Sequence, residues 1–276
     1  MTWTIPRDER SGQDRRIPYY LRIRDHFASL IEKGVLPPGG KLPPERELRD
    51  GLQTTRVTVR QALMQLEAEG LIYRENRRGW FVSPPRIQYD PTTNVSFTES
   101  VLAQGRTPGS TVLSKEQISA SSWESRHMDV EVGSPIFLIR RLRSVDGRAV
   151  LLEHLHINAE RCPGLLELPL DRSMTELMSE HYGILEYRPS INMRPTALTG
   201  PQAEALGVAA GTPSLYLSRA IFDQFNRVVE IDQEFWRHDA IDICVSAKEP
   251  IGEEASARRH KLIKRSVKCR VKRRSS

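Results

Sequence analysis

Residues 54–82 read TTRVTVRQALMQLEAEGLIYRENRRGWFV, and this stretch decides the fold of the first part of the chain. Its middle has the apolar spacing of a helix from about Arg56 to Glu69, with Leu63 and Leu66 facing inward, and Gly70 fits the end of that helix. Two short apolar runs, LIY and WFV, then surround the basic turn RENRRG. We therefore expect one helix followed directly by a β-hairpin.

The residues before this stretch predict two further helices. From Tyr19 the apolar side chains recur on one helical face, and the glycines and prolines of KGVLPPGGKLPP end that helix. A short helix follows in PERELRDGL, with Leu48 and Leu52 four residues apart. Three helices and a hairpin within residues 18–82 indicate a winged helix-turn-helix.

The polar start of the third helix suits double-stranded DNA. A helix fits the major groove with its N-terminal residues at the base edges, where arginine can bond guanine and hydroxyls can bond phosphate. The basic turn would then lie along the backbone or in the minor groove. The candidate DNA contacts from this reasoning are Lys41, Thr55, Arg56, Thr58, Arg60, Arg77, Arg78 and Gly79. The alternative is a protein-interaction module with solvated charges.

Charge is unevenly distributed along the 276 residues. Residues 18–85 hold eleven Lys/Arg and eight acids, whereas residues 86–254 hold sixteen and twenty-four. The last segment, 255–276, has ten Lys/Arg and no acid. Nucleic acid is thus the expected partner of the first domain and not of the acidic middle. A non-specific nucleic-acid binder that uses the basic tail is an alternative.

The composition also bears on the compartment. The three cysteines are scattered, which argues against a disulfide framework or a paired metal motif, and no apolar run approaches a membrane span. The first residues lack the apolar centre of a signal peptide. We expect a cytoplasmic protein of a reducing compartment with no cofactor, no metal site and no membrane contact.

After a proline-containing segment the pattern changes to strands. The run PIFLIRRLRSVDGRAVLLEHLHI predicts a hairpin about Asp146–Gly147, and a second hairpin is expected near Asn226. Two helices, in SMTELMSEHYG and TGPQAEALGV, lie between them, which indicates an α+β domain on an antiparallel sheet. The expected domains are a flexible arm (1–17), the winged helix-turn-helix (18–82), a linker (83–93), the α+β domain (94–248) and a basic tail (249–276).

The second domain contains residues that suit a small anion. Arg141 and Arg143 are two positions apart on one predicted strand, so both side chains project from one face. Two guanidinium groups together suit a phosphate or phosphonate. Glu153 and Glu230 lie on other strands and would suit a ligand that also carries a cation or hydroxyls. On pattern alone, solvated surface arginines and glutamates remain the alternative.

The motifs GGKLPPEREL, TTRVTVRQALMQLEAEGLI and RRGWFV resemble the N-terminal domain of the GntR family of bacterial transcription regulators. The resemblance implies DNA contacts from the arginine of the L-P-x-E-R motif, the start of the recognition helix and the wing. By motif these are Arg46, Thr55, Arg56, Thr58, Arg60, Arg78 and Gly79. Pro44 stands where relatives usually carry Ser, so a capping hydroxyl is lost.

Residues 94–246 resemble the effector domain of the HutC branch of that family, the UTRA domain, which has a chorismate-lyase-like α+β fold. The resemblance implies effector contacts from Gly105, Arg106, Arg141, Arg143, Glu153, Ser173 and Glu230, with Trp236 where many relatives have Tyr. It also implies a homodimer on a palindromic operator, with repression released by ligand as the commoner behaviour. A chorismate-lyase-like enzyme is the alternative from a different class, but the sequence has no nucleophile elbow, phosphate loop or metal motif.

Several phrases, among them DPTTN, RLRSVDGRAV and FWRHD, are most similar to the regulators of 2-aminoethylphosphonate uptake and degradation. The ligand's chemistry agrees, since its phosphonate suits the arginines and its ammonium suits a glutamate. An amino-sugar phosphate is the alternative effector. We expect a ligand-responsive repressor of phosphonate genes.

Overall fold

The computed structural model describes residues 17–245, except 76–77, 94 and 185–186, and leaves out the side chains of 187–189 as well. Nearly all of the expected arm, the whole expected basic tail and the candidate DNA contact Arg77 therefore lie outside the described residues.

The first domain has the expected three helices and hairpin. These are α1 (Tyr19–Glu32), α2 (Glu45–Gly51), α3 (Arg56–Ala68), β1 (Ile72–Glu75) and β2 (Gly79–Val82). One apolar core joins them, with Phe27 of α1, Leu48 of α2 and Leu63 of α3 fully buried. Gly70 follows α3 with a positive φ of 73°, a conformation that suits glycine at the end of a helix. The winged helix-turn-helix expectation is confirmed.

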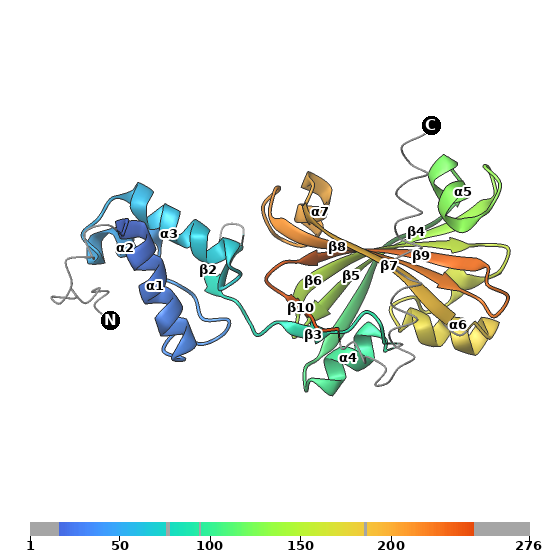
Figure 1. Cartoon of the computed structure of the whole chain (residues 1–276), viewed down its shortest axis with the longest axis horizontal. Helices are drawn as coiled ribbons and strands as arrows, with labels where there is room; N and C mark the ends of the chain where they lie inside the picture. The colour runs from blue at the N-terminus through green and yellow to red at the C-terminus, as the bar shows by residue number, and fades with distance from the viewer. Residues whose placement is uncertain (1–16, 76–77, 94, 185–186, 246–276) are drawn as a thin grey trace, which may run out of the picture. The chain divides into compact units, whose positions relative to one another are not determined.

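The second domain is built on one antiparallel sheet of order β4-β5-β6-β9-β8-β7 (Figure 1). Its strands are β4 (Pro108–Ser119), β5 (Pro135–Val145), β6 (Arg148–Asn158), β7 (Tyr187–Ala197), β8 (Pro213–Phe222) and β9 (Val228–Arg237). Its helices are α4 (Phe97–Ala103), α5 (Ser122–Met128), the 3₁₀ turn η2 (Leu165–Glu167), α6 (Met174–Tyr182) and α7 (Gly200–Ala205). The predicted α+β class with an antiparallel sheet is confirmed.

Both predicted hairpins form where the turn residues indicated. Asp146 and Gly147 connect β5 to β6 with φ values of 51° and 78°, and Asn226 has a φ of 59° between β8 and β9. Positive φ at these positions fits the right-handed twist of the flanking strands. These turns fix the register of the central strands and so decide which side chains share a face.

The two faces of the sheet have different coverings (Figure 1). Alternate residues such as Ile139 and Leu155 pack with Leu177 of α6 on one face, whereas Leu152 packs with Ala203 of α7 on the other. The face under α6 also carries the arginines and glutamates that the sequence singled out. The candidate pocket therefore lies between the sheet and α6.

The segment expected to be a linker contains a strand. Residues Ile87–Tyr89 form β3, which pairs in parallel with β10 (Ile241–Ile243) at the end of the second domain. Ile87 and Tyr89 are both buried in an apolar cluster of that domain. The sequence did not predict this strand, because three residues are too few to show the alternation of a strand and the segment around it is rich in proline.

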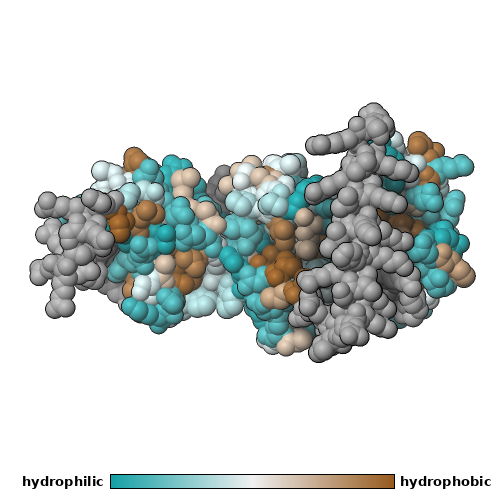
Figure 2. Space-filling view, in the orientation of Figure 1, coloured by the Kyte–Doolittle hydropathy of each residue, from teal (hydrophilic) through white to brown (hydrophobic). Residues whose placement is uncertain are grey.

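No helix in the described part of the chain is long and apolar enough to cross a membrane. Figure 2 shows that most of the described surface on the face it draws is hydrophilic, with small hydrophobic patches.

Candidate functional site

The first candidate site is a groove between the starts of α2 and α3 and the β1–β2 hairpin. Four of the predicted DNA contacts line it: Lys41, Arg56, Arg78 and Gly79. Lys41 forms an isolated backbone bridge with Phe81, and the Leu42 N–H donates to the Trp80 carbonyl, so the segment before α2 is held against the hairpin. Arg74, which the sequence reasoning did not select, lines the same groove and is exposed.

Thr55 and Thr58 organise the start of α3. The Thr55 hydroxyl accepts a hydrogen bond from the Thr58 backbone N–H at 3.1 Å and contacts the Thr58 hydroxyl at 2.9 Å. Thr55 is thus the N-cap of the helix, a role that the sequence analysis did not give it. Pro44 caps α2 without a side-chain bond, as expected where a capping hydroxyl is lost.

The arginines at this site are exposed and only weakly held. Arg56 contacts Glu45 at 3.5 Å with its side chain 75% exposed, and Arg78 pairs with Glu75 at the hairpin turn. Exposed ion pairs of this kind contribute little stability, so phosphate or base edges can replace the carboxylates. Arg46 and Arg60 are exposed outside the groove.

The recognition helix α3 also has exposed apolar side chains, which its apolar periodicity could have predicted. Val57 is 66% exposed and Met64 55% exposed, although both are apolar residues of α3. Both residues lie outside the buried face of the helix, which Val59, Leu63 and Leu66 form. Val57 lies in the first turn, where a methyl group can contact the methyl of thymine.

The second candidate site is the cavity on the α6 face of the sheet. Residues opposite each other across antiparallel strands share a face, so the pairing places polar side chains in rows. Arg141 lies opposite Glu153, which lies opposite Glu234. In a neighbouring row of the sheet, Leu155 lies opposite Asp232, which lies opposite Arg219. Six of the eight predicted effector contacts line this cavity: Arg141, Arg143, Glu153, Ser173, Glu230 and Trp236.

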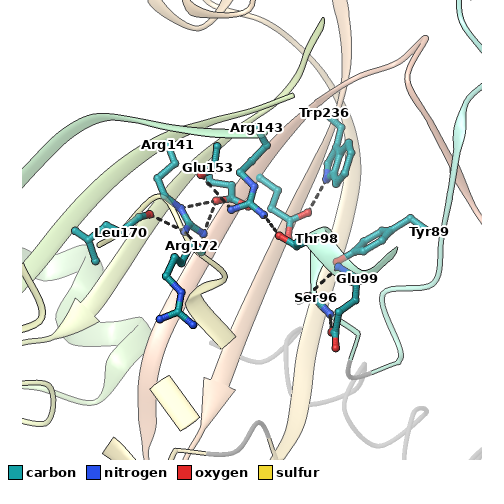
Figure 3. A network of polar contacts seen from close by, with 12 residues as sticks. Tyr89, Ser96, Thr98, Glu99, Arg141, Arg143, Glu153, Leu170, Arg172 and Trp236 are labelled. Carbon is teal, nitrogen blue, oxygen red and sulfur yellow. Dashed lines mark hydrogen bonds and ion pairs between the residues drawn. The ribbon is translucent and has the colours of Figure 1, made fainter. Parts of the chain in front are cut away.

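Arg141 is buried and fully engaged by the protein itself (Figure 3). Its Nε donates to Glu153 at 2.9 Å, and a second guanidinium nitrogen lies 2.8 Å from the same carboxylate. A third nitrogen donates to the carbonyl oxygens of Leu170 and Arg172 at 3.1 and 2.9 Å. Arg141 therefore fastens the loop before α6 to the sheet.

Arg143 has weaker partners, although it is equally buried. One terminal nitrogen donates to the Thr98 hydroxyl at 3.1 Å (Figure 3). The other donates to the Ser110 hydroxyl at 3.3 Å, and the guanidinium lies over the Phe97 ring. Its Nε makes no hydrogen bond within the described residues and lies 3.8 Å from Glu153. Neutral hydroxyls are easily exchanged for a charged oxygen, so Arg143 is the better anion donor of the two.

Glu153 holds both arginines in place. Burial by itself would raise its pKa, but the charges of Arg141 and Arg143 hold the pKa of this carboxyl below its usual value. Glu153 is therefore ionised at neutral pH and serves as the common counter-ion of the two guanidinium groups.

Ser173 and Trp236 shape the two ends of the cavity. The Ser173 hydroxyl caps α6. Ser173 and the first residues of α6 line the pocket, and the N–H groups at a helix N-terminus favour an anion. The Trp236 indole donates to Glu234 at 2.5 Å and packs against the ring of Tyr89.

The structure does not bring Gly105 and Arg106 into this cavity. Arg106 pairs instead with Asp146 at 2.8 Å and donates to the carbonyl of Pro85 at 2.8 Å. Asp146 also accepts from the Thr107 backbone, so it fixes this segment to the β5–β6 turn. Gly105 has a φ of 70° after α4 and faces open space.

Several cavity residues were missed by the sequence reasoning, above all Tyr89, Arg219, Asp232 and Glu234. Asp232 and Glu234 lie between Glu230 and Trp236 at alternate positions of β9, so the period of a strand could have found them. Tyr89 comes from β3, whose pairing no local pattern revealed.

Within the described residues no group of three or more His, Cys, Asp or Glu is placed to hold a metal ion. His154 and His156 lie on β6, and burial lowers the pKa of His154 to about 4.

Comparison with known proteins identifies both domains. Residues 19–82 match the family model of bacterial regulatory proteins, gntR family, and residues 103–242 match the UTRA domain. The uncharacterized HTH-type transcriptional regulator YihL of Escherichia coli K12 is 32% identical over 78% of this chain and 92% of its own length. The HTH-type transcriptional repressor NagR of Bacillus subtilis is 31% identical over 81% and 92%.

Among solved structures, PhnF from Mycobacterium smegmatis is similar with a TM-score of 0.59 and 27% identity, over 82% of this chain and 99% of that one. These relatives are transcription regulators and not enzymes, and the two matched models correspond to a DNA-binding and an effector-binding domain. The chain belongs to the GntR family of transcription regulators, in the branch that carries a UTRA domain, and is a ligand-responsive regulator that binds operator DNA.

Proposed function

We propose that this regulator represses genes for phosphonate uptake or degradation and releases its operator when 2-aminoethylphosphonate binds. The observation that carries the proposal is that one cavity is lined by both buried arginines and buried carboxyl groups. Arg143 and the N-terminal end of α6 suit the phosphonate, and the carboxylates on β9 suit the ammonium. Similarity of the chain's motifs to phosphonate regulators supports the same ligand.

The size of the cavity favours a small effector. The centre of a water molecule can move through about 60 Å³ of this cavity, and that space is enough for a few water-sized groups. An amino-sugar phosphate remains the second candidate, because it also carries an anion and an amine. A relative from Escherichia coli K12, 26% identical over 83% of this chain, is named as a probable fructoselysine utilization operon transcriptional repressor, and fructoselysine also carries an amine.

We further propose that the protein binds a palindromic operator as a two-fold dimer through Lys41, Arg46, Arg56, Arg60, Arg78 and the wing glycine Gly79. One winged helix is small for tight specific binding, and two copies on two half-sites supply the missing contacts. The dimer is tested by light scattering at micromolar concentration with and without operator; a monomer in both conditions contradicts it.

The effector is tested by thermal unfolding with 2-aminoethylphosphonate, phosphonoacetaldehyde and amino-sugar phosphates, because a ligand of the native state raises its unfolding temperature. An operator is obtained by selecting bound sequences from random duplex DNA. The stabilising ligand must then weaken operator binding in a fluorescence anisotropy titration. A ligand that stabilises the protein and leaves operator affinity unchanged contradicts the proposed repression.

A further inference from the structure

Asp232 lines the cavity and forms no ion pair with the described arginines that line it. Three arginines, Arg141, Arg143 and Arg219, share it with four acids, Glu153, Glu230, Asp232 and Glu234. Glu153 pairs with Arg141 and Arg143, and Glu234 lies 3.5 Å from Arg219. The carboxyl group of Asp232 therefore has no ion-pair partner among the described residues.

Asp232 is also incompletely hydrogen-bonded. Its side chain is bonded to Glu234, but its Oδ1 is buried with no hydrogen-bond partner among the described residues. The residue is only 8% exposed and lines the cavity. Leaving a buried carboxyl oxygen without a hydrogen-bond donor is costly whether or not the group is protonated, so this atom points to a donor that the described residues do not supply.

We propose that Asp232 is the counter-ion of an ammonium group on the effector, and that the cavity therefore selects small anions that also carry an amine. This inference rests on the proposed anion-sensing function and adds the residue that sets its specificity. The anion lies toward Arg143 on β5, and β9 is two strands away, a separation of roughly 10 Å between backbones that the two side chains shorten. A compact ligand with charges of both signs can span it.

The titration of Asp232 supplies an independent signature. Burial raises the pKa of Asp232 well above its usual value, and the charges of Glu234, Glu153 and Glu230 raise it further, against the opposing charge of Arg219. Burial likewise raises the pKa of Glu234. The other charged or titratable groups that line the cavity among the described residues are Arg141, Arg143 and Tyr89. Below the raised pKa, Asp232 holds a proton in the free protein.

An ammonium group favours the ionised carboxylate, so binding of an amine-bearing anion displaces that proton. The affinity for such a ligand rises with pH until the pH passes the raised pKa of Asp232, whereas the affinity for an amine-free analogue does not follow this rise. Calorimetry of the parent protein in two buffers of different ionisation enthalpy measures the proton released.

The test uses two matched ligand pairs in calorimetry: 2-aminoethylphosphonate with ethylphosphonate, and glucosamine 6-phosphate with glucose 6-phosphate. The parent should bind the amine member of at least one pair about tenfold more tightly, as a charge-assisted hydrogen bond allows. Asp232→Asn should abolish that preference and leave the amine-free ligand within about twofold of the parent. Asp129→Asn, an exposed position that tolerates Asn at its φ of 55°, is the control and should behave like the parent.

The outcomes separate this inference from the function on which it rests. Binding of a pair with equal affinity, or a preference that survives Asp232→Asn, overturns the ammonium site and leaves anion sensing intact. Failure of all four ligands to bind overturns the proposed effector class together with the inference. Proton release by the parent with the amine member alone supports the site even where Asp232→Asn does not fold, and its absence contradicts it.

Discussion

The Tyr89 hydroxyl accepts a hydrogen bond from Arg219, which joins strand β3 to the effector cavity. Tyr89 follows the wing strand β2 by only seven residues along the chain and packs its ring against Trp236. The segment that leaves the DNA-binding domain thus provides part of the cavity wall. A ligand that engages Arg219 would compete with this bond, so we expect β3 to carry the effector signal toward the DNA-binding domain.

We expect Tyr89→Phe to weaken the coupling between effector and operator. The change removes one hydroxyl and keeps the ring packed on Trp236, so operator affinity without effector should stay close to that of the parent. The effector-induced loss of operator affinity should fall, because a ligand can shift the equilibrium only by its differential affinity for the two states. Anisotropy titrations with and without 2-aminoethylphosphonate measure both quantities.

Tyr182→Phe is the matched control for this change. The Tyr182 hydroxyl donates to the Pro163 carbonyl at 3.0 Å and does not line the cavity, so its removal should leave the response unchanged. An unchanged response in Tyr89→Phe would show that β3 does not transmit the signal.

The exposed arginines of α3 should behave differently from Lys41. Arg56→Ala or Arg60→Ala is expected to cost about 1–3 kcal/mol of operator binding if the arginine reads a base, with less loss on unrelated DNA. Lys41→Ala should weaken all sequences alike and lower the dependence of affinity on salt. Arg126→Ala removes the same charge from an exposed position of α5 and serves as the control. Equal losses on operator and random DNA for the α3 variants would exclude base reading.

Thr55 should contribute mainly to the stability of α3. Thr55→Ala removes the side chain that accepts from the Thr58 N–H, and loss of such a cap costs about 1 kcal/mol of unfolding free energy. Thr55→Ser keeps the hydroxyl and should restore most of it. Urea unfolding of the three proteins measures the difference. Equal stability of the alanine and serine variants would mean that the cap contributes nothing, and Thr55 would return to being a candidate phosphate contact alone.

The winged helix was predictable because its signals are local. Leu63 and Leu66 mark the buried face of α3, and the turns at Asp146–Gly147 and near Asn226 fix both hairpins. The strand period placed Arg141 and Arg143 on one face, and the structure keeps them there.

The remaining features depend on pairings between distant segments. Tyr89 enters the cavity only through the parallel pairing of β3 with β10, and no local pattern encodes that partner. Arg106 was expected beside the anion, but in the structure it forms an ion pair with Asp146 at 2.8 Å, outside the cavity. The sequence shows that Arg141 and Arg143 share a face, yet it cannot show that loop carbonyls already occupy one of them.

Arg141 and Arg143 should therefore give opposite phenotypes, although they are alike in sequence. Arg141→Met leaves the buried Glu153 with only the more distant Arg143 and frees two carbonyls of the loop before α6. Removing one partner of a buried ion pair costs about 3–5 kcal/mol, so this variant should unfold at a markedly lower urea concentration.

Arg143→Met keeps the Arg141–Glu153 pair and gives up hydroxyl partners that water can replace, so its stability should change by about 1 kcal/mol or less. It should nevertheless lose its response to 2-aminoethylphosphonate while it still binds the operator. Arg140 lies on the opposite face of the same strand, where it contacts the exposed Glu116 at 3.5 Å and donates to the Ser114 hydroxyl at 3.4 Å, so Arg140→Met should resemble the parent in both assays. If Arg143→Met still responds at the parent's ligand concentration, or if Arg141→Met is as stable as the parent, the division between a structural and a ligand-binding arginine is wrong.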